Sequence, residues 1–199
     1  RSNLTRKFAY DTLHRAIEKR HPDGYLELIR ATLLLEDKKF GEAADAYAKA
    51  ADTPAFLVGV RREALYGAAM AEAAAVLIDK DEKHSFAQAA AYLRERIRLG
   101  PLKGQQAMWA AGIARLAGDY TLGLQILDAW QKVDPQSLSL CVCRVKLELA
   151  EDHYGAACRH ADTGIQLAQQ ALQSNPKDTN VTTTLADLER LRREAAEKW

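Results

Sequence analysis

Apolar residues recur every three or four positions along much of this sequence. The pattern is clear near both ends, at Leu4, Phe8, Leu13, Ala16 and Ile17, and at Val181, Leu185, Leu188, Leu191, Ala195 and Trp199. This spacing places the apolar side chains on one face of an α-helix. Alanine is abundant, whereas the long runs of Val, Ile and Thr that strands favour are missing. The pattern predicts an all-α chain.

Prolines and aromatic residues divide the chain into repeats. Each of the five prolines follows an amphipathic stretch, where proline ends one helix without breaking another: Pro22, Pro54, Pro101, Pro135 and Pro176. An aromatic residue precedes the last four of them, at Phe40, Phe86, Tyr120 and Tyr154, and the last three aromatics lie 34 residues apart. A small residue follows each aromatic three positions later, at Ala43, Ala89, Gly123 and Ala157. These markers predict a repeated helix–turn–helix unit.

This arrangement resembles the tetratricopeptide repeat family, whose period is 34 residues. The clearest repeat, residues 104–137, contains Gly118-Asp119-Tyr120, Leu127, Trp130 and Asp134-Pro135. The resemblance implies a right-handed helix–turn–helix solenoid of about ten helices, forming a single domain over residues 1–199. Its repeats would span residues 24–54, 55–101, 102–135 and 136–176, with terminal helices over residues 3–20 and 178–199.

The sequence departs from the family pattern at three places. The Trp and Leu-Gly expected in each first helix are largely replaced by Ala, with Tyr66-Gly67 the nearest match. Phe40 and Phe86 are 46 residues apart, which predicts a lengthened first helix over about residues 55–78 and a charged loop over residues 79–83. Tyr154 lies 22 residues before Pro176, against 15 from Tyr120 to Pro135, so the last second helix should be two turns longer.

The resemblance implies that the first helices line a concave groove that binds a peptide or helix of a partner protein. From the register we expect this groove to be lined by Tyr25, Leu28, Thr32, Arg61, Gln105, Met108, Arg115, Ser139, Val142 and Lys146. The three cations in that set would suit a peptide with apolar anchors and an acidic residue or two. The alternative is that Leu28, Met108 and Val142 belong to the core. The paired Lys and Asn of a carboxylate clamp are absent from the comparable positions.

Charge and hydropathy exclude other classes of partner. Lys and Arg total 28 against 27 for Asp and Glu, so no net field points to nucleic acid. No stretch reaches the roughly 18 apolar residues of a membrane span, which predicts no membrane insertion. The chain begins at Arg1 and shows no signal-peptide pattern. We expect a soluble protein, cytoplasmic or periplasmic, and a fragment of a longer chain fits the same observations.

Metal-ligating residue types gather at Cys141, Cys143, Cys158, His153 and His160. Two cysteines separated by one residue on a helix point to different faces, so we expect buried packing rather than a metal site. His84, beside the charged loop, is expected to be solvated. No pair of acidic residues stands out as a general acid and base, and the sequence predicts neither an enzyme nor a cofactor.

Three functions remain open from the sequence. The first is a scaffold or adaptor that binds a peptide or helix in the groove. The second is an assembly module that forms a homo-oligomer through its terminal helices, with the last helix binding another subunit instead of capping the array. The third is an accessory repeat domain of a longer enzyme or regulator.

Overall fold

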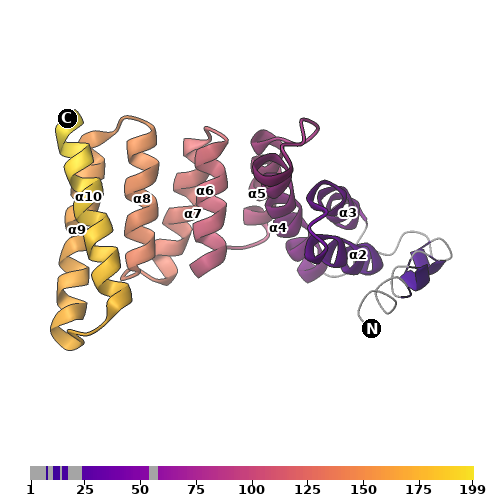
Figure 1. The fold of residues 1–199 in the computed structure, drawn as a ribbon, viewed down its shortest axis with the longest axis horizontal. Coiled ribbons are helices and arrows are strands. Elements are labelled where there is room, and N and C mark those ends of the chain that lie inside the picture. Colours follow the sequence, from indigo (N-terminus) through magenta and orange to yellow (C-terminus); the bar gives the residue numbers. More distant parts are fainter. Residues whose placement is uncertain (1–7, 9–10, 14, 18–23, 54–57) are drawn as a thin grey trace. The chain divides into compact units, whose positions relative to one another are not determined.

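The computed structural model describes residues 8, 11–13, 15–17, 24–53 and 58–199, and helices dominate this part of the chain (Figure 1). None of the described residues forms a β-strand, which confirms the predicted all-α class. The described residues of the expected helix over residues 3–20 are helical, whereas Pro22 and Pro54 lie outside the described residues. The chain divides into two compact units, Arg1–Gly100 and Pro101–Trp199. The single domain expected over residues 1–199 stays a prediction.

The N-terminal unit contains two helical hairpins. Its described helices are α2 (Gly24–Glu36), α3 (Phe40–Asp52), α4 (Val58–Ala74), the π-helix η1 (Ala75–Asp79) and α5 (Phe86–Arg98). Each α-helix packs against the next one, and α2 also packs against α4. The core between α2, α3 and α4 is built mainly of alanine, which allows the helix backbones to approach closely.

The C-terminal unit repeats this arrangement. Its helices are α6 (Gly104–Leu116), α7 (Tyr120–Val133), α8 (Leu138–Ala150), α9 (Tyr154–Ser174) and α10 (Thr179–Lys198). Consecutive helices pack together, and α8 also contacts α6 and α10. Packing between alternate helices, in both units, is the layering expected of stacked hairpins.

Three hairpins share one turn. The residue two positions before the aromatic has a left-handed backbone in each, with φ of 60° at Lys38, 68° at Gly118 and 57° at Asp152. The next amide donates to a carbonyl five residues back in all three turns: Lys39 to Leu34 at 2.9 Å, Asp119 to Ala114 at 2.8 Å and His153 to Glu148 at 2.9 Å. This bond satisfies a carbonyl that the helix end leaves free. The 34-residue spacing of the aromatics therefore corresponds to a repeated local structure.

The second hairpin carries the predicted insertion. Helix α4 continues into η1, so that the helical segment runs from Val58 to Asp79, against an expected segment of about residues 55–78. Lys80 then takes a left-handed backbone with φ of 53°, and the charged loop follows before Ser85 caps α5. In the last hairpin, α9 has 21 residues against 14 for α7, which confirms the two-turn extension.

The small residues of the repeat lie where helices meet. Ala43, Ala89, Gly123 and Ala157 are all buried. A Cβ atom at Gly123 would lie 2.8 Å from a side-chain carbon of Leu147 on α8, so a larger residue would separate α7 from α8. This close approach explains the small residue three positions after each aromatic.

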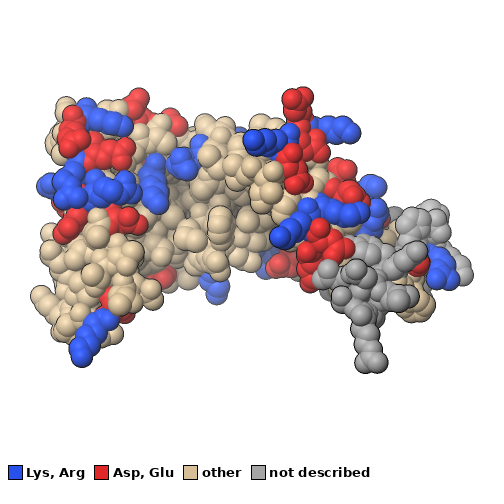
Figure 2. Space-filling view, viewed as in Figure 1, with Lys and Arg blue, Asp and Glu red and all other residues tan. Residues whose placement is uncertain are grey.

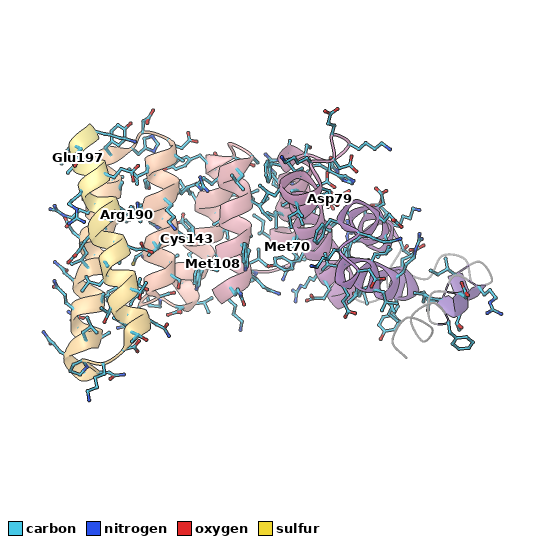
Figure 3. The ribbon with its side chains drawn as sticks, viewed as in Figure 1. Met70, Asp79, Met108, Cys143, Arg190 and Glu197 are labelled. Atoms are coloured by element: carbon cyan, nitrogen blue, oxygen red, sulfur yellow. The ribbon has the colours of Figure 1, made fainter. Side chains whose placement is uncertain are left out.

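Helix α10 covers the end of the C-terminal unit. Asp178 caps it by accepting hydrogen bonds from the amides of Asn180 and Val181. Leu188, Leu191 and Ala195 are buried in a cluster shared with α8 and α9. The expected stripe continued to Trp199, but the side chain of this residue is 81% exposed and its ring lies beside Gly155. Arg190 and Glu197 lie on the outer face of α10 (Figure 3).

Candidate functional site

The N-terminal unit has a groove of about 480 Å³ between α2 and α4. Helix α2 contributes three residues, α3 one and α4 four: Leu28, Thr32, Leu35, Tyr47, Glu63, Tyr66, Gly67 and Met70. Met70 is labelled on α4 in Figure 3. Both α2 and α4 are the first helices of their hairpins, and the hairpin partner of α2 contributes only Tyr47. The groove is therefore mainly a surface of first helices.

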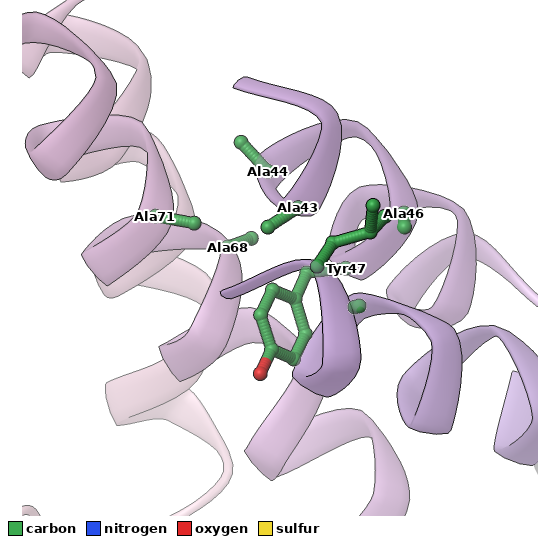
Figure 4. Packing of buried hydrophobic residues seen from close by; sticks show 8 residues of the cluster. Ala43, Ala44, Ala46, Tyr47, Ala68 and Ala71 are labelled. Atoms are coloured by element: carbon green, nitrogen blue, oxygen red, sulfur yellow. The ribbon is translucent and has the colours of Figure 1, made fainter. Parts of the chain in front are cut away.

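Tyr47 of α3 is the buried residue of the groove. Its side chain reaches between α2 and α4 because small residues around it let α3 lie close to α4, at Ala43, Ala44, Ala46, Ala68 and Ala71 (Figure 4). The tyrosine hydroxyl lies 3.3 Å from Oγ1 of Thr32. The single proton of Thr32 is donated to the carbonyl of Leu28 at 2.9 Å, so Tyr47 is the donor to Thr32. This bond fixes the ring of Tyr47 against α2.

The walls of the groove are apolar apart from one carboxylate. Leu28, Leu35 and Met70 are half-buried and present aliphatic or thioether surface. Glu63 is exposed and is the charged residue among those lining the groove. Burial raises the pKa of Tyr66, and Glu63 raises it further. Burial likewise raises the pKa of Tyr47, where the hydrogen bond from Thr32 acts in the opposite direction and Glu63 and Glu36 add to the increase.

The predicted groove residues of the N-terminal unit divide into two pairs. Leu28 and Thr32 line the groove, whereas Tyr25 and Arg61 are not among its lining residues. Tyr25 is 60% exposed in the first turn of α2. Arg61 forms an ion pair of 3.1 Å with Glu95 of α5. The cation expected to meet an acidic peptide is thus bound within the chain.

Sequence reasoning missed four polar or large residues of the groove. Tyr47 comes from a second helix and lies seven residues after Phe40, on the same helix face, so it was indistinguishable from core. Tyr66 and Gly67 were recognised only as a partial family match. Glu63 and Met70 lie three and four residues from Tyr66 and Gly67, a spacing that could have placed them on one face of α4.

The remaining predicted residues lie on α6 and α8 of the C-terminal unit. Gln105, Arg115, Ser139 and Lys146 are exposed, and Met108 and Val142 are half-buried. Val142 packs against the core of α8, α9 and α10. Around α6 and α7 the visible face carries mostly uncharged side chains, whereas charged residues gather over α9 and α10 (Figure 2). Charges of both signs alternate there, as in the ion pairs of Arg192 with Asp162 and of Arg190 with Glu194.

The cysteines pack as expected. Cys141 and Cys158 are buried in the α8–α10 core, whereas Cys143 lies outside that cluster and is half-buried. Burial raises the pKa of the Cys143 thiol to about 11, which keeps it protonated at neutral pH. His153 and His160 each place Nδ1 near the buried carboxylate of Glu148, at 3.2 and 3.8 Å. Among the described residues, no group of three His, Cys, Asp or Glu has the geometry to hold a metal ion.

The expectation that His84 is solvated was wrong. Its side chain is 9% exposed, and Nδ1 lies 2.8 Å from the buried carboxylate of Glu72. The amide of Ser85 donates to the same carboxylate at 2.9 Å. A carboxylate buried on α4 needs such partners, and it draws the histidine inward from the charged loop. The pair therefore anchors the loop between η1 and α5.

No helix of the described chain is long and apolar enough to cross a bilayer. No family model matches the sequence, and a search of curated proteins finds no match.

Proposed function

We propose that this chain is a tetratricopeptide-type repeat protein that binds a peptide or helical segment of a partner protein in the groove between α2 and α4. In this proposal its hairpins stack as a right-handed solenoid, and recognition rather than catalysis is its activity. The turn shared at Lys38, Gly118 and Asp152 supports the repeat. The packing of α2 against α4 and of α6 against α8 supports the stacking.

The observation that carries the proposal is the groove itself. Its volume of about 480 Å³ has room for a few side chains of a bound segment. Aliphatic walls supply apolar contact, and the hydroxyl groups of Tyr47 and Tyr66 supply hydrogen bonding. Aromatic residues of this kind are frequent where proteins bind one another, because they combine a large apolar area with a polar end.

Self-association through the last helix has less support. The apolar stripe of α10 is used inside the C-terminal unit, where Leu188, Leu191 and Ala195 pack on α8 and α9. Helix α10 therefore resembles a terminal cap, and we place partner binding in the groove instead.

The test is a substitution that fills the groove. Thr32 is exposed at its edge, so Thr32→Trp would occupy space that a bound segment needs. Thr163→Trp is the matched control, because Thr163 is also an exposed helical threonine whose hydroxyl donates to the carbonyl four residues back. Neither change removes a buried apolar side chain. Helical content by circular dichroism establishes that both variants fold.

The probe is a library of random peptides displayed on phage and selected on the full chain. Enriched peptides are synthesised with a fluorescent label, and their affinity is measured by fluorescence anisotropy. Thr32→Trp should weaken binding by about tenfold or more, equivalent to about 1.4 kcal/mol, whereas Thr163→Trp should change it by less than about twofold. Failure to select any peptide, or equal binding by Thr32→Trp and the wild type, would contradict the proposal.

A further inference from the structure

We propose that the segment bound in the α2–α4 groove presents a lysine or arginine between apolar residues, and that its cation pairs with Glu63. This inference rests on the proposed function and names its partner class. It differs from the acidic partner that the sequence suggested. The argument concerns the carboxylate of Glu63, the cations around it and the apolar walls beside it.

The carboxylate of Glu63 is available to a ligand. Glu63 lines the groove, is exposed, and forms no hydrogen bond or ion pair with any residue that the structure describes. A carboxylate in an apolar groove without a partner favours an incoming cation.

The nearby cations are bound elsewhere. Arg61 pairs with Glu95 at 3.1 Å. Arg62 donates to the carbonyl of Leu99, and Arg96 donates to the carbonyl of Gly100 at 2.9 Å. These arginines hold the end of α5 and the residues after it, so the chain supplies no cation to the groove carboxylate.

The balance of charge at the groove is acidic. At Tyr66, the effect of Glu63, which raises the pKa, is larger than that of Arg96, which lowers it. At Tyr47, both charged groups that shift the pKa are carboxylates, Glu63 and Glu36. An acidic side chain of a bound segment would therefore be repelled at the position where a basic one is attracted.

The walls suit the stem of a long basic side chain. Lys and Arg carry aliphatic chains that pack on apolar surface while the charged end stays near water. Leu35 and Met70 offer such a surface in the same groove as Glu63. The ring of Tyr66 adds an aromatic face with which a cation interacts favourably. A basic residue flanked by apolar residues would use all of these contacts together.

The experiment uses the peptides selected on the full chain. The best-enriched peptide is synthesised in three forms that differ at its basic position, with lysine, norleucine or glutamate. These are measured against the wild type, Glu63→Gln and Thr32→Trp, at low and high salt. Glu189→Gln is the matched control, because Glu189 is an exposed helical glutamate of α10, outside the groove.

We expect the selected peptides to share a lysine or arginine with apolar neighbours. Norleucine should weaken binding about three- to tenfold, and glutamate more. Glu63→Gln should weaken the lysine peptide by the same factor and leave the norleucine peptide unchanged, and this difference should shrink at high salt. Glu189→Gln should bind like the wild type.

The outcomes separate this inference from the proposed function. If Thr32→Trp blocks binding but the peptides lack a common cation, or Glu63→Gln binds the lysine peptide as the wild type does, the cation pairing is wrong and the groove remains a binding site. If no peptide is selected, or Thr32→Trp has no effect, both proposals fail.

Discussion

The aromatic ring of Tyr47 lies directly on the backbone of Gly67. A Cβ atom built at Gly67 would be 2.5 Å from Cε1 of the ring, which is closer than any ordinary carbon contact. Gly67 is helical, so glycine serves here to make space rather than to adopt an unusual backbone. The contact joins α3 to α4 and places Tyr47 in the groove.

Gly67→Ala should destabilise the chain, because the buried ring of Tyr47 cannot move without disturbing the alanine core around it. Overpacking of this kind costs about 1–3 kcal/mol, partly offset by the 0.5–1 kcal/mol or so that alanine gains over glycine in a helix. Urea unfolding followed by far-UV circular dichroism measures the change.

Gly112→Ala is the matched control. Gly112 is also helical, in α6, and a Cβ there would meet nothing within 4 Å. That substitution should stabilise the chain by about 0.5–1 kcal/mol. Equal effects at the two glycines would show that the Tyr47 ring does not require the space at Gly67.

The hairpins could be predicted from the sequence because their signals are local. The aromatic residue, the small residue three positions later and the proline each act within one or two helical turns, and the structure shows the same turn at Lys38, Gly118 and Asp152. The length of α9 followed from counting residues between Tyr154 and Pro176.

The groove could not be predicted in the same way, because its residues are set by contacts between helices. Whether Arg61 is free to meet a ligand depends on Glu95, 34 residues away. Whether His84 is solvated depends on Glu72, a charged residue that α4 buries. Such pairings are decided by helix packing, and a single sequence does not state which polar side chains will meet.

Tyr120→Phe should destabilise the C-terminal unit. The Tyr120 hydroxyl donates at 2.8 Å to the carboxylate of Glu148, which is 4% exposed. Burial and the carboxylate raise the pKa of Tyr120 to about 12, so the hydroxyl is protonated at neutral pH. Loss of a hydrogen bond to a charged group costs about 1.5–3 kcal/mol.

Tryptophan fluorescence measures this effect, since all three tryptophans lie in the C-terminal unit and Trp130 is buried. Tyr154→Phe is the control, because its hydroxyl donates to Asp152 at the surface. That change should cost less than about 0.5 kcal/mol. Similar losses in both variants would mean that the buried position of Glu148 does not strengthen its bond with Tyr120.

His160 should make the C-terminal unit less stable in mild acid. Burial lowers the pKa of His160, and Arg144 and Arg159 lower it further against the opposing effects of Glu148 and Asp128. The unfolded chain, with a histidine pKa of about 6.5, therefore binds a proton more readily than the folded one. Stability from this residue is present above that pH and is lost as the pH falls through the lowered folded value.

The free energy of unfolding, followed by tryptophan fluorescence, should thus decrease between about pH 7.5 and pH 5.5, a window above the range in which most carboxylates titrate. His160→Gln cannot take up a proton, so it should lose less stability than the wild type over the same window. The other histidines are present in both proteins, and the difference between the two curves therefore isolates His160. A variant curve parallel to that of the wild type would mean that protonation of His160 is equally favourable in the folded and unfolded chain. The buried Nδ1 of His160, which lies 3.8 Å from Glu148, would then gain enough from that carboxylate to offset the two arginines and its own burial.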